Sequence, residues 1–141
     1  MASTDTMTLE LCAPESVRVH LTVREVHVPG SAGYFTVLPG HTALLSTIIP
    51  GVLMGIDEAG NEHFFALNKG FVEVRNNQVT VLADSFEEGE EVDPKRAEAA
   101  LERAKERLQH ANEPDISVER AERSLSRSLA RLSAKHRERH F

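Results

Sequence analysis

SFEEGEEVDPKRAEAALERAKERL, residues 85–108, is where the character of the chain changes. Before this stretch, apolar and polar residues alternate and are interrupted by Gly and Pro; after it there is no Gly, and Ala, Leu, Glu and Arg dominate. Alternation with a period of two is typical of strands, whereas apolar spacings of three and four are typical of helices. The stretch therefore predicts a strand-rich part and then a helical part, with an acidic joint between them.

Size and charge limit what the protein can be. With 141 residues, the chain has room for one modest core and an appendage. The net charge of −6 argues against nucleic acid as the main partner, but residues 116–141 hold seven Lys or Arg against three Asp or Glu and would suit an acidic partner or a phosphate. The single cysteine, Cys12, excludes a disulfide framework and indicates a reducing compartment. We expect Cys12 to be a small core residue in a strand.

We expect neither a targeting signal nor direct membrane insertion. The first residues, MASTDTMTLEL, lack a basic region followed by an apolar run. The longest apolar segment, residues 43–56, is broken by polar residues, Pro50 and Gly51 and is too short to cross a bilayer. Any link to a membrane would therefore go through a protein partner.

The first part of the chain, residues 1–86, predicts an antiparallel β-sandwich or flattened barrel. Val17 to Val23 alternate in one phase and Val26 and Val28 in the other, which predicts a bulge near Arg24–Glu25. Gly60 and Asn76–Asn77 tolerate positive φ and predict hairpin turns. The expected strands cover residues 9–11, 17–28, 34–38, 52–56, 62–67, 71–75 and 78–82, and an apolar piece, residues 43–49, lies between two turns.

The second part, residues 94–141, predicts an antiparallel two-helix hairpin, so the fold class is α+β. Asp93 before Pro94 fits an N-cap, and Ser117 fits the cap of a second helix. Each helix carries one apolar stripe with spacings of three and four. The stripes are Ala97, Leu101, Ala104, Leu108 and Ala111, and Val118, Ala121, Leu125, Ser128 and Leu132. Because Ala and Ser bury little area, we expect the two helices to associate weakly with each other and the hairpin to be able to open.

Three motifs occur in order: GYFTVLPGHTALLSTIIPG (33–51), GFVEVRNNQVTVLAD (70–84) and VDPKRAEAALERA (92–104). Together they resemble the epsilon subunit of F-type ATP synthases over essentially the whole chain. The resemblance implies a non-catalytic rotor subunit of the central stalk, peripheral on the cytoplasmic face of the cell inner membrane, in a complex that couples hydrogen ion transport to ATP synthesis. It implies that the sandwich contacts the gamma subunit and the c-ring, and that the hairpin rests on the sandwich or extends to inhibit hydrolysis by the catalytic alpha and beta subunits.

The resemblance also implies a regulatory ATP site, although no cofactor is required. The family's I/L-D-x-x-R-A motif reads VDPKRA here, and two arginines of the second helix correspond to Arg127 and Arg131. The implied nucleotide-binding residues are Val92, Asp93, Arg96, Ala97, Arg127 and Arg131. Guanidinium groups one turn apart can fork onto phosphate oxygens. The alternative is that Asp93 only caps its helix and the arginines lie on a solvated face.

Other implied contacts involve the ring, the catalytic subunits and the joint. Tyr34 and His41 correspond to the ring-contacting edge, although His41 could simply bond to its own turn. Arg120, Arg123 and Lys135 belong to a basic face that would engage acidic loops when the hairpin extends. The acidic joint, residues 87–93, is expected to be a hinge in which like charges and the flexible Gly89 keep the hairpin from docking firmly.

Two other classes of protein stay open: a free-standing adaptor whose hairpin binds a partner helix, and a soluble ATP-sensing protein. No nucleophile–base pair, paired carboxylates or phosphate loop is evident, so an independent enzyme is not expected. His136 and His140 have a spacing that could hold a metal, but no third ligand is nearby, and we expect no metal site.

Overall fold

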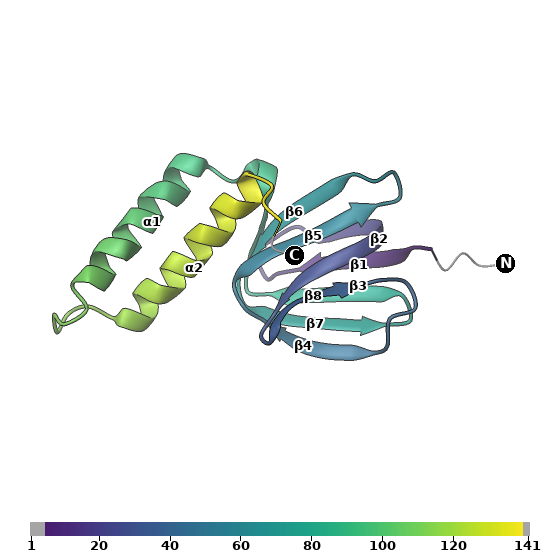
Figure 1. Ribbon diagram of the computed structural model, residues 1–141, viewed down its shortest axis with the longest axis horizontal. Coiled ribbons are helices and arrows are strands. Elements are labelled where there is room, and N and C mark those ends of the chain that lie inside the picture. Colours follow the sequence, from purple (N-terminus) through teal and green to yellow (C-terminus); the bar gives the residue numbers. More distant parts are fainter. Residues whose placement is uncertain (1–4, 140–141) are drawn as a thin grey trace.

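Within residues 5–139, which the computed structural model describes, nine strands are followed by two helices (Figure 1). The strands are β1 (Met7–Cys12), β2 (Val19–Gly30), β3 (Gly33–Val37), β4 (Leu44–Ile48), β5 (Gly51–Asp57), β6 (Glu62–Leu67), β7 (Gly70–Arg75), β8 (Gln78–Ala83) and β9 (Phe86–Glu88). A short 3-10 helix, η1 (Gly89–Glu91), leads to α1 (Pro94–Gln109) and α2 (Val118–Lys135). The predicted α+β class and the order of its two parts are confirmed.

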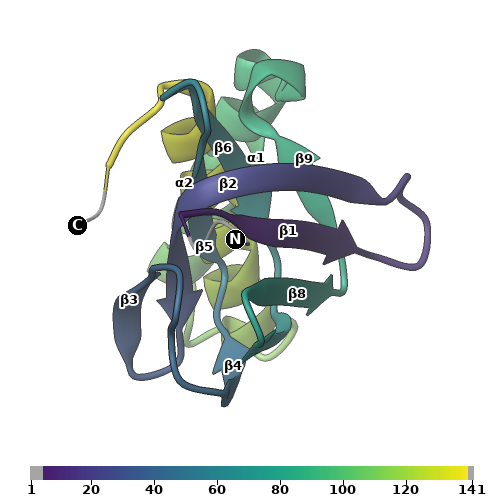
Figure 2. The same cartoon turned by 90° about the vertical axis from the view of Figure 1, so that its right-hand side faces the viewer.

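The strands form one sheet that folds over into two layers, with neighbours in the order β1-β8-β7-β4-β2-β5-β6-β9 and β3 attached to β2. The long β2 also pairs with β1, which closes the sheet into a flattened barrel (Figure 2). The register shifts between Val23 and Glu25, so the predicted bulge is confirmed. Asn76, Asn77 and Gly60 have positive φ, as expected of the predicted turns.

Three local expectations about the strands are wrong. Val17 precedes β2 and is 89% exposed, because its strand begins only at Val19. Cys12 ends β1 half-buried rather than in the core. The pairing of β1 with β8 is parallel, whereas only antiparallel pairs were expected; the alternation within a strand does not indicate the direction of its neighbour.

The main core lies between the two layers and is lined by alternating residues of the strands. Val72 and Val74 of β7 point inward, while Phe71 of the same strand is exposed. Strands β5 and β6 differ, because the runs 52–55 and 64–67 are buried on both faces. Phe65 faces the main core, and the opposite faces of these two strands are covered by the helical hairpin.

Both helices begin as predicted. The Asp93 side chain accepts hydrogen bonds from the backbone N–H groups of Lys95 and Arg96 at 3.0 and 3.3 Å, and Ser117 caps α2 through Arg120 N–H. α1 packs along α2, which lies between α1 and the sandwich (Figure 1). Ala97, Ala104, Ala121 and Ser128 of the predicted stripes are buried. Ala111 is exposed, because α1 ends at Gln109.

The acidic joint is ordered in this arrangement. Its first residues continue the sheet, since Glu87 and Glu88 of β9 pair with Ala66 and Phe65 of β6. The next three form η1, and Val92 is 2% exposed. Sheet and hairpin are therefore joined by a short structured segment, and bending at the joint stays a prediction.

Candidate functional site

The candidate site is the docking surface between α2 and the sandwich. Ala130 and Ala134 form a second face of α2, turned away from the helix–helix stripe. They pack on outward-facing side chains of β5 and β6, which are Val52, Met54, Phe64 and Ala66. Each methyl-sized group buried adds only about 0.8 kcal/mol. The larger side chains of this contact, Val52, Met54 and Phe64, come from the sandwich and are almost fully buried.

Gly89 lets the backbones approach at this surface. A Cβ added to Gly89 would lie 2.4 Å from the carbonyl oxygen of Ala134 and 3.3 Å from that of Phe64. The backbone of Gly89 is not in the left-handed region, so space rather than conformation requires glycine here. The residue that was expected to provide flexibility is buried under the end of α2 when the hairpin is docked.

Charged contacts surround the end of α2. Arg131 donates to both carboxylate oxygens of Glu87, from Nε at 2.9 Å and Nη2 at 3.4 Å. Lys135 Nζ donates to the carbonyl of Glu90 at 3.0 Å. Half-exposed ion pairs such as Arg131–Glu87 contribute about 0–1 kcal/mol each.

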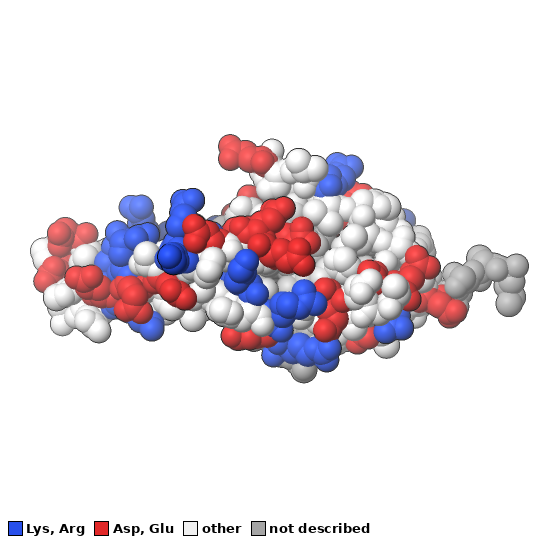
Figure 3. All heavy atoms as spheres, turned by 90° about the horizontal axis from the view of Figure 1, so that it is seen from above, with Lys and Arg blue, Asp and Glu red and all other residues white. Residues whose placement is uncertain are grey.

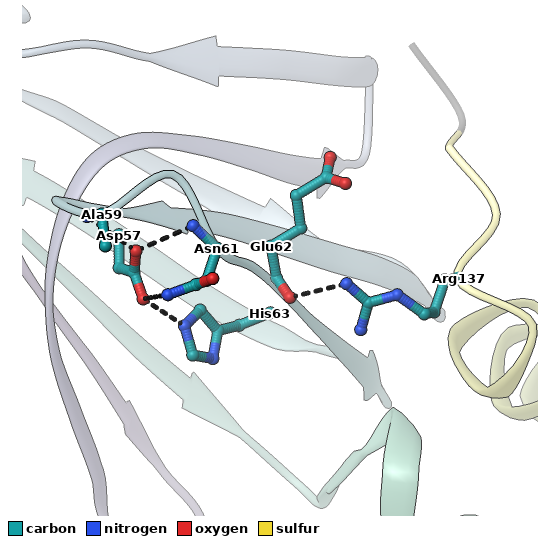
Figure 4. Close-up of polar contacts among 6 residues, drawn as sticks. All are labelled: Asp57, Ala59, Asn61, Glu62, His63 and Arg137. Atoms are coloured by element: carbon teal, nitrogen blue, oxygen red, sulfur yellow. Dashed lines mark hydrogen bonds and ion pairs between the residues drawn. The ribbon is translucent and has the colours of Figure 1, made fainter.

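The chain beyond α2 returns to β6. Arg137 donates from Nη2 to the carbonyl oxygen of Glu62 at 3.0 Å (Figure 4). Its guanidinium also lies 4.8 Å from the centre of the Phe64 ring. Arg139 forms an ion pair with the Glu62 carboxylate. These contacts were not predicted. Two features of the sequence could have indicated this surface. They are the cations at every second position from Lys135 to Arg139, and the two small residues Ala130 and Ala134, which lie one helical turn apart.

The turn that precedes Glu62 is held by Asp57 (Figure 4). Its carboxylate accepts hydrogen bonds from the backbone N–H groups of Ala59 and Asn61, at 3.0 and 2.9 Å, and from His63 Nε2 at 2.9 Å. These hydrogen bonds, that from His63 above all, lower the pKa of Asp57 to about 2. The turn therefore presents Glu62 in a defined position.

The predicted nucleotide-binding residues are only partly brought together. Arg127 and Arg131 line one cavity of ≈120 Å³, with Glu87 beside them. Val92, Asp93, Arg96 and Ala97 are not among its lining residues; Ala97 is 0% exposed, and Asp93 is occupied as a helix cap. Small-molecule sites typically have about 300–1,000 Å³. As arranged here, the residues do not fit a bound nucleotide, and nucleotide binding stays a prediction.

The two residues predicted to face the c-ring have contacts within the sandwich. The hydroxyl oxygen of Tyr34 accepts a hydrogen bond from Val52 N–H at 2.9 Å, and burial raises the pKa of Tyr34. His41 Nδ1 donates to the carbonyl of Thr42 at 2.6 Å, as the turn alternative supposed. His41 also lines an open cavity of ≈680 Å³ between the start of β4 and the end of β7. Contact with a ring stays a prediction for both.

When the hairpin is docked, only part of the predicted basic face bonds to the rest of the protein. Within residues 5–139, the side chains of Arg120 and Arg123 form no ion pair and are exposed on α2, whereas Lys135 bonds to the joint. Figure 3 shows acidic and basic side chains intermingled over the hairpin, in the left half of the view.

His140, one of the two histidines with metal-like spacing, lies outside the described residues. Among the helices of residues 5–139, none is long and apolar enough to cross a bilayer.

Comparisons with known proteins divide the chain at the same joint. Residues 6–89 match the family model described as ATP synthase, Delta/Epsilon chain, beta-sandwich domain, and residues 90–135 match its long alpha-helix domain. The chain is 42% identical to an ATP synthase epsilon chain of Desulfitobacterium hafniense (strain Y51), over 92% of this chain and 96% of the relative. It is 41% identical to that of Solibacter usitatus (strain Ellin6076), over 92% and 95%.

A solved structure shares the fold. A chain of the Euglena gracilis mitochondrial ATP synthase, solved as an OSCP/F1/c-ring assembly in rotational state 1, superimposes with a TM-score of 0.81. The match covers 94% of this chain and 82% of the other, at 22% sequence identity. At that identity the likeness concerns the fold, including the order of sandwich and hairpin.

Proposed function

Because the chain belongs to the family of ATP synthase epsilon chains, we propose that it couples ion-driven rotation of the c-ring to ATP synthesis as a non-catalytic subunit of the central stalk. The observation that carries this proposal is the match of both domains, in order, at about 40% identity over most of the chain. The sandwich would bind the gamma subunit and the c-ring and so place the protein at the membrane surface.

Co-purification from native membranes tests this coupling role. A tagged chain is expected to bring down gamma and the c-ring in fixed proportion, in an amount that detergent washing does not reduce. If neither is retained and a single helical partner appears instead, the chain acts as an adaptor and the rotor role is wrong.

We propose further that the hairpin inhibits ATP hydrolysis when it leaves the sandwich. Support comes from Arg120 and Arg123, which are exposed and without ion pairs in the described residues, and from the docking contact, to which α2 contributes only Ala130 and Ala134 among the buried apolar residues. Leaving the sandwich would free Lys135, Arg137 and Arg139 from their contacts with the joint and β6, completing a basic face for the acidic loops of the catalytic subunits.

Removal of residues 90–141 tests inhibition. This deletion keeps β9 and its pairing with β6, so all strands of the described sheet are retained. We expect the assembled complex to retain synthesis and to hydrolyse ATP faster than the intact complex. Equal hydrolysis under all conditions would remove the inhibitory role and leave the coupling role standing.

Regulatory ATP binding is the second candidate, favoured by the shared cavity of Arg127 and Arg131. Any phosphate would compete there with the Glu87 carboxylate for Arg131. Calorimetry with ATP is expected to show binding that Arg127→Ala abolishes and that Arg103→Ala, a matched cation on the other helix, preserves. No heat from the intact chain at millimolar ATP would remove this candidate.

A further inference from the structure

We propose that the C-terminal end of α2 and the residues after it form an ionic clasp that sets how often the hairpin is docked, so that salt or a competing acidic surface releases it. The clasp is defined as Arg131, Lys135, Arg137 and Arg139 with their partners Glu62, Glu87 and Glu90. Its effect on hydrolysis rests on the proposed inhibitory role. Its effect on docking does not.

The clasp connects one helix end to three separate parts of the sandwich and joint. Arg131 reaches β9, Lys135 reaches η1, and the residues beyond α2 reach β6. Two of the contacts are ion pairs with carboxylates, Arg131–Glu87 and Arg139–Glu62. The other two contacts, from Lys135 and Arg137, are hydrogen bonds to backbone carbonyls. They position the end of α2, and substitution of the acidic side chains does not remove their acceptors.

The clasp lies where the hairpin is anchored. The loop between α1 and α2 projects away from the sandwich, on the left of Figure 1, and docking involves only the C-terminal half of α2. The chain enters α1 from η1 beside that same half. Loss of contacts at this end would therefore free the whole hairpin, with α1 and α2 still packed together on the joint.

Charge can shift the docking equilibrium because two ion pairs, Arg131–Glu87 and Arg139–Glu62, cross from the hairpin to the sandwich. Two alanines supply the helix side of the apolar contact, and Gly89 supplies no side chain at all. The ion pairs are partly exposed, with side-chain accessibilities of 28% and 31% for Arg131 and Glu87. Interactions between such exposed charges weaken as salt rises.

The test measures docking in the isolated full-length chain. Spin labels at Gln78→Cys on β8 and Gln109→Cys at the end of α1, in a Cys12→Ser background, report the distance between sandwich and hairpin tip. Salt is raised from about 50 mM to about 500 mM, which shortens the screening length from roughly 14 Å to roughly 4 Å. We expect the docked population to fall; a population that does not change with salt would overturn the clasp.

Substitution of the acids provides a second measurement that leaves all cations of the hairpin in place. Glu62→Gln with Glu87→Gln is expected to lower the docked-to-released ratio about fivefold at low salt. Glu15→Gln with Glu58→Gln makes the same charge change at exposed sites of the sandwich and should leave the ratio unchanged. An equal fall in both double variants would contradict the proposal.

A charge exchange distinguishes the ion pair from general damage. Glu87→Arg and Arg131→Glu are each expected to release the hairpin, and together they should restore docking. A double variant that stays released would overturn the pair's role in the clasp. If the acid-side variant releases the hairpin but hydrolysis by the complex is unchanged, the clasp stands and the inhibitory function fails.

Discussion

At the residue scale, Gly89 shows how one missing side chain permits docking. The carbonyl of Ala134 occupies the place that a Cβ would take, at 2.4 Å. A carbonyl group of the backbone cannot move aside for an added Cβ as easily as the end of a flexible side chain can. The sequence offered a different interpretation, because a glycine among acids is typical of a flexible joint, and only the position of α2 shows that space is the constraint.

Gly89→Ala is therefore expected to displace the end of α2 and release the hairpin while the sandwich stays folded. Hydrogen exchange should show faster exchange across α2 and unchanged protection in β7 and β8. Ser85→Ala, at an exposed position just before the joint, is the control and should have no effect. Unchanged protection of α2 in Gly89→Ala would mean that the close approach is not needed for docking.

Asp57 allows a prediction about pH. Its pKa is lowered from 3.8 to about 2 by hydrogen bonds that favour the charged carboxylate, so its contribution to folding is present above its ordinary pKa and is lost as pH falls from about 4 to about 2. In Asp57→Asn, we expect the free energy of unfolding to depend less steeply on pH in this window. Urea unfolding at several pH values measures this dependence, and Asp84→Asn, which removes an exposed acid, is the control. If the free energy of unfolding of wild type and Asp57→Asn changed equally with pH, the stabilising role of the Asp57 carboxylate would be contradicted.

At the element scale, α2 has two functional faces and α1 has one. The predicted stripe of α2 faces α1, as Ala121 and Ser128 show, whereas Ala130 and Ala134 face the sandwich. A stripe with spacings of three and four identifies one contact of a helix. The second contact was missed because two alanines one turn apart are common on solvent-exposed faces, and only the position of β5 and β6 makes them a docking face.

The cap of α1 separates helix stability from any role in nucleotide binding. Asp93→Ala removes the acceptor for two backbone N–H groups and should destabilise α1 by about 0.5–2 kcal/mol. Faster hydrogen exchange of the first turn of α1, without ATP present, is the expected measurement. Asp115→Ala, in the loop before α2, is the control, and equal exchange in wild type and Asp93→Ala would show that the cap is dispensable.

At the scale of the whole molecule, the sandwich is a closed body and the hairpin an arm attached at one end. The sheet closes through β1–β2 and extends through β9 to the joint. The arm is held by the packing of Ala130 and Ala134 on the outward faces of β5 and β6, by the close approach of Gly89 and by the clasp. Large movements should therefore occur at the joint, with the sandwich unchanged.

This arrangement makes a prediction for the assembled complex. Glu62→Gln with Glu87→Gln should shift the hairpin toward the extended state and lower ATP hydrolysis, because the cations of the hairpin are then available to the catalytic subunits. The same complex lacking residues 90–141 should show no response to the two substitutions. Hydrolysis that falls equally in the truncated complex would assign the effect to the sandwich.

Local sequence determined most of the elements. The phase change after Val23 predicted a bulge, Asn76–Asn77 predicted a turn, and Asp93–Pro94 predicted a helix start; the structure confirms all three. Each depends on neighbours in the chain, through alternation, backbone conformation or capping. The family resemblance rested on motifs of the same local kind, and the comparisons confirm it.

Tertiary structure alone decided which distant residues meet. The parallel pairing of β1 with β8, the pairing of β9 with β6 and the bonding of Arg131 to Glu87 join segments far apart in the chain. Many acids and bases could have paired with equal Coulomb energy, so their types alone do not select partners. The selection follows from packing, because Ala130 and Ala134 of α2 cover the outward faces of β5 and β6, and this contact brings the charges of both parts together.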